Sequence, residues 1–504
     1  MKRWIAWILL TVILTGAAAF GEEAAPGGSY TLAGLDETQY RSWGSNAFFA
    51  NMEELTGIHF DTRQYTTAAE WTAAKQAMTA GGDLPDVLFK AQLTSWECME
   101  LLDRGVLVDL APYLETCCPH LWSLLQANEG YLDAITLPDG RIAALPYINE
   151  TPAQNIMWIN QSFLKKVGKS MPATAEELTE VLRAFRDHDV NGNGNPNDET
   201  PFGFLGPYDL KYLAHAFGMI CNEYNVYEDG TGTVRYMPLD ERFPEFIRWL
   251  RQLYQEGLLD QDGFSQTDSM RTVSSASDPV EYGILMAPMI TTLLPSEWLG
   301  EYVCMPALTC DGEAVYRDFG GGLQRGTFAV TTACRDVPEI LGWVDRLYTE
   351  EGAILATVGR KNKDYIVDGD GTWRLTESAS SDSYHSVSAT ISSAAAFPGY
   401  SADAFQARYN DAGLARMMGM LKEFSSACKR AYPYVNLTRA ESERVNELQM
   451  TLGMLVDMHI ARWVLGEEEP TDERFEAFAA ELKEAGLDEF LSIWQKKLDE
   501  RGGN

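Results

Sequence analysis

The 504-residue sequence lacks the short motifs that mark the common catalytic sites. It contains no HExxH, GxSxG, GxxxxGK[ST] or strand-linked GxGxxG, and it has only six histidines. These absences argue against zinc proteases, α/β serine hydrolases and nucleotide-binding enzymes. A glycosidase that uses two carboxylates has no such signature, because its acids lie far apart in sequence. We therefore expect a protein that is not an enzyme, with a secreted glycoside hydrolase as the alternative.

Basic residues are scarce. The chain has 40 Lys and Arg against 73 Asp and Glu, which gives a formal net charge of −33. A surface this negative repels nucleic acid and anionic membranes. We expect neither as a partner, and we expect a monomer.

Cysteines are few for the length. Eight in 504 residues are too dilute for a disulfide scaffold, and no CxxC occurs. Buried free thiols are the ordinary state of such residues. A pair between Cys304 and Cys310 is the alternative in an oxidising exterior.

Long apolar runs are missing except at the N-terminus. There, Lys2 and Arg3 precede an apolar stretch from residue 4 to residue 14, followed by GAAAFG and two glutamates. This pattern predicts a secretory signal peptide over residues 1–21. Cleavage after Gly21 is preferred to cleavage after Ala19, and an uncut membrane anchor is the alternative. The stretch is shorter than the ~20 residues that a spanning helix needs.

The remaining composition, 45% hydrophobic and 22% charged, is typical of a globular protein, and the length favours two or more lobes. Between residues 30 and 114, strand-like runs such as GIHFDTRQY and LPDVLF alternate with a helical pattern that stops at Gly57. This order predicts a parallel sheet with crossover helices, an α/β fold. Thr174 and Glu177 predict a capping box that starts another helix. The last hundred residues are helical in pattern.

Residues 187–201, DHDVNGNGNPNDETP, hold many side-chain oxygens in a short space. Ca²⁺ binds six to eight oxygens, often from alternate residues of a loop with glycine at the sixth position. Counted from Asp189, the alternate residues are Asp189, Asn191, Asn193, Asn195 and Asn197. Gly194 is then the sixth; counted from Asp187, the sixth is Gly192 and the twelfth is Asp198. The pattern predicts a calcium site, and a surface loop of Asx turns is the alternative.

Aromatic side chains are the other candidate for binding. The sequence has 13 Trp and 22 Tyr. Those expected in loops or at strand ends are Trp43, Trp96, Trp158, Trp298, Trp373, Tyr147, Tyr208 and Tyr212. Flat aromatic faces suit the CH-rich faces of sugar rings, and neighbouring Asn or Asp suit hydroxyls. For each residue alone, core packing is the ordinary role.

Eight segments resemble, in this order, the extracellular solute-binding proteins of sugar ABC transporters, of the long Gram-positive kind. They are NMEELTGI, GGDLPDVLF, DGRIAALPY, WINQSFLKKVG, PATAEELTEVLRAF, DVNGNGNPNDETP, RGTFAVTT and PEILGWVDRLYTEEGAILATVG. The resemblance spans most of the chain after the predicted signal. It implies a type II periplasmic-binding-protein-like fold, with two α/β lobes, crossing hinge strands and a helical C-terminal part.

The resemblance also implies how the chain divides. Residues 28–148 would form the first lobe, with 308–375 returning to it, and residues 149–307 the second, with 376–504 returning to it. A ligand would bind between the lobes. The positions expected to face it are Trp43, Asn46, Tyr147, Trp158, Tyr208, Tyr212, Trp298 and Trp373.

Longer members of this family often carry a calcium loop of the form D-x-N-x-N-G-x-x-D-E. It maps onto Asp189, Asn191, Asn193, Asn195 through its carbonyl, and Asp198 with Glu199. The resemblance thus implies a structural Ca²⁺. One extra residue precedes the Asp-Glu pair here, so Asn197 and Asp198 both stay open for the ninth-position role.

The implied function is to capture a carbohydrate, an oligosaccharide, and deliver it unreacted to the membrane permease of an ABC transporter. A peptide or another polar solute in the same cleft is the alternative ligand. Gram-positive members usually have Leu-x-Gly followed by a lipid-bearing Cys, whereas here Leu14-Thr15-Gly16 is followed by Ala17. The resemblance therefore implies an exported protein, extracellular or periplasmic, without a lipid anchor.

Overall fold

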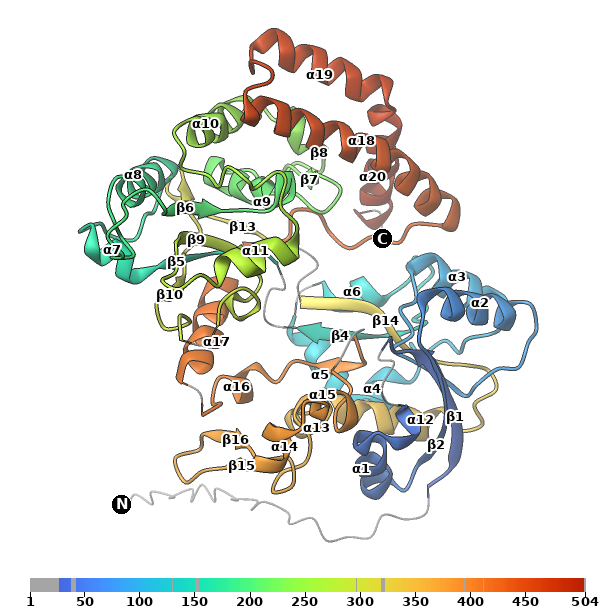
Figure 1. Ribbon diagram of the computed structural model, residues 1–504. Helices are drawn as coiled ribbons and strands as arrows, with labels where there is room; N and C mark the ends of the chain where they lie inside the picture. The colour runs from blue at the N-terminus through green and yellow to red at the C-terminus, as the bar shows by residue number, and fades with distance from the viewer. Residues whose placement is uncertain are drawn as a thin grey trace, which may run out of the picture.

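The structure is a computed structural model that describes residues 27–502, apart from 38–41, 129, 150–153, 296, 319–321, 393–395 and 411. The predicted signal peptide, residues 1–21, lies outside the described residues. Two separate sheets, each with its own hydrophobic core, divide the described chain into two lobes (Figure 1). The predicted α/β fold with two lobes is confirmed.

The first lobe is built on a six-stranded mixed sheet with the order β17-β4-β14-β3-β1-β2. Its strands are β1 (Ser29–Leu35), β2 (His59–Tyr65), β3 (Val87–Phe89), β4 (Leu145–Asn149), β14 (Gly322–Val330) and β17 (Gly399–Tyr400). β1 pairs in parallel with β2 and β3, as the alternating pattern predicts. β14 runs antiparallel between β3 and β4.

Helices cover both faces of this sheet, which is why its central strands are apolar on both sides. In β3, Val87 and Phe89 pack into one core cluster and Leu88 into another on the opposite face. The helices of this lobe are α1 (Ala47–Thr56), α2 (Ala68–Thr79), α3 (Ser95–Asp103), α4 (Leu114–Cys117), α5 (Pro119–Ala127), α6 (Tyr131–Ile135), α12 (Val337–Asp345), α13 (Glu350–Thr357), α14 (Glu377–Ser381), α15 (His385–Ser388) and α16 (Asp403–Gln406).

The second lobe holds a four-stranded sheet with the order β10-β5-β9-β6. Its strands are β5 (Ile156–Asn160), β6 (Thr200–Gly203), β9 (Tyr282–Ala287) and β10 (Tyr302–Cys304). Its helices are α7 (Gln161–Lys166), α8 (Ala175–Arg186), α9 (Gly206–Tyr212), α10 (Phe243–Gln255), α11 (Asp268–Ser275), α17 (Ala412–Ser425), α18 (Arg439–Leu465), α19 (Asp472–Glu484) and α20 (Leu487–Gly502). The C-terminal helices α18–α20 lie on this lobe (Figure 1), so the helical C-terminal part is confirmed.

Short elements complete the described chain. The two-stranded ribbons are β7 (Val226–Glu228) with β8 (Val234–Tyr236), β11 (Thr309–Cys310) with β12 (Glu313–Ala314), β13 (Tyr316–Arg317) with β18 (Cys428–Lys429), and β15 (Tyr365–Val367) with β16 (Trp373–Leu375). The 3₁₀ helices are η1 (Trp43–Ser45), η2 (Leu213–Phe217), η3 (Met237–Leu239), η4 (Ile290–Thr292) and η5 (Arg346–Tyr348). All eight cysteines are free, and so Cys304 and Cys310 are not bonded to each other.

Two predicted helix ends can be compared with the structure. Gly57 ends α1 in the left-handed conformation, with φ of 72°, which glycine adopts without strain. Thr174 caps α8 by accepting a hydrogen bond from the Glu177 backbone nitrogen at 3.2 Å. The Glu177 side chain accepts from the Ala173 nitrogen instead of from Thr174, so only half of the predicted capping box is present.

The chain returns between lobes later than the sequence suggested. Residues 309–317, assigned to the first lobe, pack on the second: the Thr309 nitrogen donates to the Ala173 oxygen, and Tyr316 belongs to the second core. The predicted return at residue 376 is also too early, because β17 pairs with β4 of the first sheet. The segment between residue 376 and β17 is rich in serine, and β17 has only two residues. Neither feature produces a hydrophobic periodicity from which the lobe boundary could be predicted.

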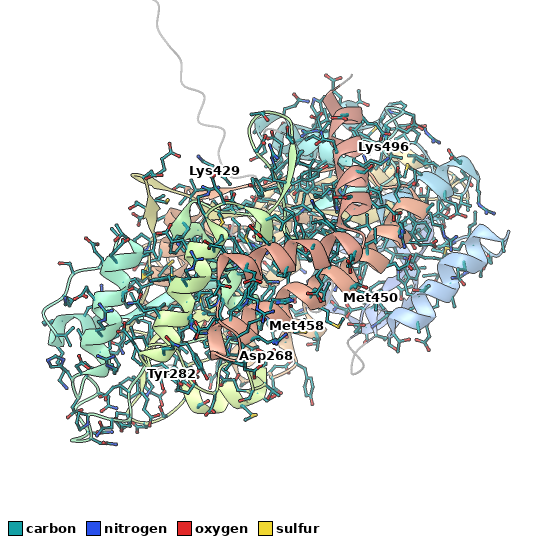
Figure 2. All side chains as sticks on the ribbon, turned by 90° about the horizontal axis from the view of Figure 1, so that it is seen from above. Asp268, Tyr282, Lys429, Met450, Met458 and Lys496 are labelled. Carbon is teal, nitrogen blue, oxygen red and sulfur yellow. The ribbon has the colours of Figure 1, made fainter. Side chains whose placement is uncertain are left out.

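Helix α18 is the longest described helix and connects the lobes. Its buried face packs on α10 and α9 of the second lobe, while Arg439 at its start lies over the Trp96 ring of α3, 4.9 Å from the centroid. Met450 and Met458 lie along one side of it (Figure 2) and are exposed. Within the described residues, no helix has the length and apolar character that a membrane span requires.

Candidate functional site

A cavity of about 380 Å³ opens at one end of the first sheet, beside the loop that follows β3 and the first half of β14. Its lining residues are Gln92, Leu93, Gln324, Arg325, Thr327 and Ala396. Four of these six side chains end in an amide, a guanidinium or a hydroxyl group, and Arg325 carries the only charge among them. Such a lining suits a ligand rich in hydroxyl groups, because each hydroxyl needs a polar partner when water is displaced.

The loop after β3 brings Gln92 to the cavity through an unfavourable backbone conformation. Lys90 and Gln92 have φ of 50° and 48°. This left-handed region costs a side chain other than glycine about 1 kcal/mol or more. The chain holds both residues there through ladder-like bonds across to β14, from the Ala91 nitrogen to the Thr327 oxygen at 2.9 Å and from the Leu93 nitrogen to the Gly326 oxygen at 2.9 Å.

On the other side, a bulge in β14 places Gln324 and Arg325. The pairing of β14 with β4 shifts register between Gln324 and Phe328, and a bulge of this kind redirects side chains. Gly326 makes the bulge possible. Its φ is 73°, and a Cβ there would lie 2.0 Å from the Leu93 oxygen.

Arg325 is anchored by one edge of its guanidinium group. Its Nη1 donates to the Val435 oxygen and to Asn436 Oδ1, both at 3.0 Å, and reaches the Ala134 oxygen at 3.4 Å. The Tyr434 ring lies beneath it, 5.5 Å from the guanidinium carbon. Burial lowers the pKa of this guanidinium from its usual value. The anchor joins β14 to the segment that leads into α18, so the cavity lies where the two lobes meet.

A second cation nearby is already neutralised. Lys90 is fully buried, and its Nζ donates to Asp36 Oδ2 at 3.0 Å. The indole nitrogen of Trp43 donates to the same oxygen at 3.1 Å. Burial is the main effect on Lys90 and lowers its pKa, and the Asp36 carboxylate acts in the opposite direction. This pair is a support beneath the loop, because a buried charge must be matched within the protein.

On the second lobe, α9 presents an exposed aromatic ring. The Tyr208 side chain is 46% exposed, and its hydroxyl lies 2.9 Å from that of the buried Tyr212. Tyr212 stacks on Tyr316 and lies under the Arg317 guanidinium, 4.3 Å from it. The exposed Tyr208 ring is therefore supported by a buried, well-packed group of side chains.

Asp209, the next residue of α9, fixes the same helix end. Its carboxylate accepts hydrogen bonds from Asn155 Nδ2 at 2.5 Å, the Leu205 nitrogen at 2.7 Å and Arg271 Nη1 at 2.9 Å. Burial outweighs these bonds and raises the pKa of Asp209 to about 6. The strand β5, the helix α11 and α9 are thereby joined at one end of the second sheet.

Four predicted ligand-facing residues are core residues instead: Tyr212, which is 1% exposed, and three tryptophans. Trp43, Trp158 and Trp373 are 2%, 0% and 4% exposed, and each indole N–H donates within the protein, to Asp36, the Ala287 oxygen and the Phe405 oxygen. A ligand cannot stack on a ring that is enclosed on both faces. Residues distant in sequence cover them, such as Phe89 against Trp43 and Phe405 against Trp373, and the local sequence does not reveal these neighbours.

The other predicted positions are divided. Asn46 caps α1 by accepting from the Phe48 nitrogen at 2.8 Å, and its amide donates to the Val387 and Thr390 oxygens. It is buried and fully engaged. Tyr147 is half-buried against Phe397, and burial raises its pKa to about 12. Trp298 is half-buried against the second core.

The oxygen-rich loop has the form of successive Asx turns. Asp189 accepts hydrogen bonds from the Gly192 and Gly194 nitrogens, at 2.7 and 3.0 Å. The Oδ1 atoms of Asn191 and Asn193 accept from the nitrogens two residues on, at 3.0 and 2.7 Å. The loop therefore turns tightly around its own side chains. Both the predicted glycines, Gly192 and Gly194, have left-handed φ of 82° and 91°.

The acids that end the loop fold back onto it. The amides of Asn191 and Asn193 donate to Asp198, and Glu199 Oε1 accepts from the Asn191 nitrogen at 3.2 Å. Glu199 Oε2 is buried and has no hydrogen-bond partner among the described residues. A buried carboxylate oxygen without a donor is costly unless a cation meets it. The residues present thus fit a hard cation, although the described residues contain no cluster of three or more His, Cys, Asp and Glu side chains with metal-binding geometry.

Sequence reasoning missed the cavity residues Gln92, Gln324 and Arg325. The segment RGTFAVTT contributed to the family resemblance, but its first residue, Arg325, was not assigned a role. The one available signal was the glycine-rich GGGLQRG before an apolar strand, which is consistent with a bulge.

Comparisons with known proteins agree with this architecture. No protein-family model matches the sequence. Over 479 residues, 90% of this chain and 86% of the relative, it is 24% identical to the fructooligosaccharide ABC transporter substrate-binding protein FusA of Streptococcus pneumoniae. It is 23% identical over 395 residues, 73% of this chain and 74% of the relative, to the lipoprotein LipO of Bacillus subtilis.

Solved structures match along nearly the whole chain. An extracellular solute-binding protein from Bifidobacterium longum subsp. infantis has a TM-score of 0.77 at 20% identity, with 95% of this chain and 99% of that chain covered. FusA in complex with kestose has a TM-score of 0.69 at 22% identity, with 94% and 100% covered. The chain therefore has the fold of the extracellular solute-binding proteins of ABC transporters and is similar in sequence to one of them along nine-tenths of its length.

Proposed function

We propose that this protein is an exported receptor that binds an oligosaccharide and delivers it unreacted to the membrane permease of an ABC importer. The observation that carries the proposal is the polar lining of the cavity at the lobe junction, within a fold shared with FusA. FusA was solved with kestose, and another structure of this fold, from Bifidobacterium longum infantis, is an HMO-binding solute-binding protein.

The two lobes supply different chemistry to such a ligand. The cavity on the first lobe offers amide and guanidinium donors from Gln92, Gln324 and Arg325. Tyr208 on the second lobe offers an exposed ring, which suits the CH face of a sugar. Closure of the lobes on a ligand would be a shift between open and closed populations.

A retention assay tests the proposal. The purified protein is incubated with pools of glycan oligomers, separated from free ligand, and the bound fraction is released and analysed by mass spectrometry. We expect an unaltered oligosaccharide and a raised melting temperature, because a ligand that binds the native state stabilises it. Tyr208→Ala should weaken retention, whereas Tyr208→Phe, which keeps the ring, should not.

The same assay separates the alternatives. New reducing ends that disappear when one carboxylate is replaced would identify a glycoside hydrolase. Retention of peptides instead of glycans would identify a peptide receptor of the same fold. Either result overturns the proposed function.

We propose that the loop of residues 187–201 binds a structural Ca²⁺. The ligands would be Asp189, Asn191, Asn193, the Asn195 carbonyl, Asp198 and Glu199. The support is the tight loop with its two left-handed glycines and the unpartnered, buried Glu199 Oε2. A calcium ion bound there would neutralise the clustered carboxylates and fix the end of α8 to the start of β6.

Export and anchoring belong to the same proposal. The sequence around Ala17 has no cysteine for lipid attachment, although one relative is the lipoprotein LipO. We propose a protein outside the membrane, extracellular or periplasmic, that reaches its permease through protein contact. N-terminal sequencing of secreted protein and a lipid-labelling assay test this directly.

A further inference from the structure

The guanidinium group of Arg325 has one edge engaged and one edge free. Its Nη1 is taken by the Val435 and Asn436 oxygens at 3.0 Å. Its Nε and Nη2 make no hydrogen bond to any described residue. These two nitrogens are also absent from the buried atoms that lack partners, so each keeps some exposed surface, and Arg325 is one of the residues that line the cavity.

The free edge has a defined recognition geometry. Nε–H and one N–H of Nη2 point in parallel directions in the plane of the guanidinium, and this fork matches the two oxygens of a carboxylate. The Nη1 anchor and the Tyr434 ring hold that plane in place. Little side-chain entropy would be lost when a ligand binds to a fork that is already oriented.

The charge of Arg325 is not balanced within the described residues. It makes no ion pair with a described carboxylate, although the whole chain has 73 acids against 40 bases. The contrast with Lys90 is informative, because Lys90 lies in the same region and is paired with Asp36 at 3.0 Å. A partly buried cation left without a counter-ion beside a polar cavity is a feature of binding sites rather than of structural supports.

We propose that the ligand is an acidic oligosaccharide, and that Arg325 binds a carboxylate of one of its sugar units through the Nε and Nη2 edge. Gln92 and Gln324, which line the same cavity, would bind the neighbouring hydroxyls. This inference rests on the proposed function and narrows its substrate to sugars that carry a uronate or similar carboxylate.

The test uses ligand pairs that differ only in charge. Wild-type protein is titrated calorimetrically with oligomers of galacturonate, glucuronate and mannuronate and with sialyllactose, each beside its methyl ester. Neutral fructo-, manno- and xylo-oligosaccharides form the comparison set. We expect at least one acid to bind with a Kd about tenfold or more below that of its ester, a difference of ~1.4 kcal/mol, because only the acid offers the guanidinium a charged partner.

Variants then assign the difference to Arg325. In Arg325→Gln the acid should bind no better than its ester, because the acid loses the charged fork whereas the ester loses only neutral hydrogen bonds and should weaken much less. Arg325→Lys keeps a charge but loses the fork and should fall between the two. Gln324→Ala is the matched control from the same strand, and it should weaken acid and ester alike. If Arg325→Gln fails to fold, the wild-type comparison of acid and ester still tests the class of ligand, and Arg325→Lys tests the residue.

The outcomes separate this inference from the proposed function. If wild type binds neutral oligosaccharides and no acidic one, or binds acid and ester equally, the inference is overturned and the proposed function stands. If an acid is preferred but Arg325→Gln preserves the preference with intact folding, the assignment to Arg325 is overturned. If no oligosaccharide of either kind binds, the proposed function fails and the inference fails with it.

Discussion

The two candidate binding sites of this protein are built in opposite ways. The oxygen-rich loop takes its polar groups from one stretch of fifteen residues, 187–201. The cavity takes its groups from the loop after β3, the bulge in β14 and residue 396. The loop site forms whenever residues 187–201 fold into their turns, whereas the cavity forms only when strands distant in sequence pair.

This contrast shows which kinds of site can be predicted from a single sequence. A run of Asp, Asn and Gly predicts its own loop conformation, because Asx turns and left-handed glycines are local preferences of these residues. The residues that line a cavity have no local sequence pattern of their own. Gln92 and Arg325 come together only when β3 and β14 pair in the folded sheet. Substitutions and calcium removal can test this contrast.

The largest effect concerns two aromatic residues of the second lobe that looked equivalent in the sequence. Trp158 is enclosed in the core, with its indole nitrogen 3.0 Å from the Ala287 oxygen, whereas Tyr208 is exposed. Trp158→Ala should lower the free energy of unfolding by ~3–5 kcal/mol, the usual cost of removing a buried Trp or Phe. Tyr208→Ala should change it by about 0.5 kcal/mol or less. Denaturant titration followed by circular dichroism measures both.

The two variants should also differ in binding. Tyr208→Ala is expected to lose oligosaccharide retention while keeping its stability. A stable Trp158→Ala protein that had lost retention would reverse the assignment, and would return Trp158 to the set of ligand-facing residues.

Calcium removal has the next largest effect. EDTA should lower the melting temperature of the second lobe, and excess Ca²⁺ should restore it, because a cation that binds only the native state adds ~2.7 kcal/mol at a hundredfold excess over Kd. Asp189→Ala should abolish this response. The response is the readout, because Asp189 also accepts two backbone hydrogen bonds in the loop and its loss alters stability by itself.

A matched pair of loop variants tests the register. Asn193→Ala removes a proposed side-chain ligand and should weaken the calcium response. Asn195→Ala should leave it intact, because its backbone carbonyl is the proposed ligand. An equal effect of the two substitutions would contradict the register that begins at Asp189. If EDTA does not change the melting temperature of the wild type, the segment is a loop of Asx turns without a calcium site.

The fold could be predicted largely because its signals are local and repeated. Val87 and Phe89 point to one face of β3 and Leu88 to the other, and an apolar run of this kind between helical patterns is typical of a parallel strand buried on both sides. Gly57 marks a helix end for the same local reason. The boundaries failed where the signal is short, as at Gly399 and Tyr400, whose strand has two residues.

The candidate site was predicted in part, and the errors share a cause. Trp43 and Trp373 were expected in loops or at strand ends, facing a ligand, yet both are buried. Phe89 packs edge-on against Trp43, and Phe405 stacks on Trp373 at 4.7 Å. Burial depends on tertiary neighbours that one sequence does not name. Conversely, Arg325 gained its role from a bulge and from the Val435 and Asn436 oxygens, which lie more than a hundred residues away along the chain.

The smallest effect tests whether the cavity carries strain for function. Gln92 lies at φ 48° and is an exposed lining residue of the cavity. Gln92→Gly should raise the free energy of unfolding by about 1 kcal/mol at most, since glycine adopts this conformation without the penalty that other side chains incur. The same variant should bind oligosaccharide more weakly, because the amide is lost. Gln92→Ala is the control: it loses the amide but keeps the penalty, so it should bind as weakly as the glycine variant and unfold more easily. If both variants bind like the wild type, Gln92 has no part in recognition, and its left-handed backbone is then a consequence of how β3 meets β14.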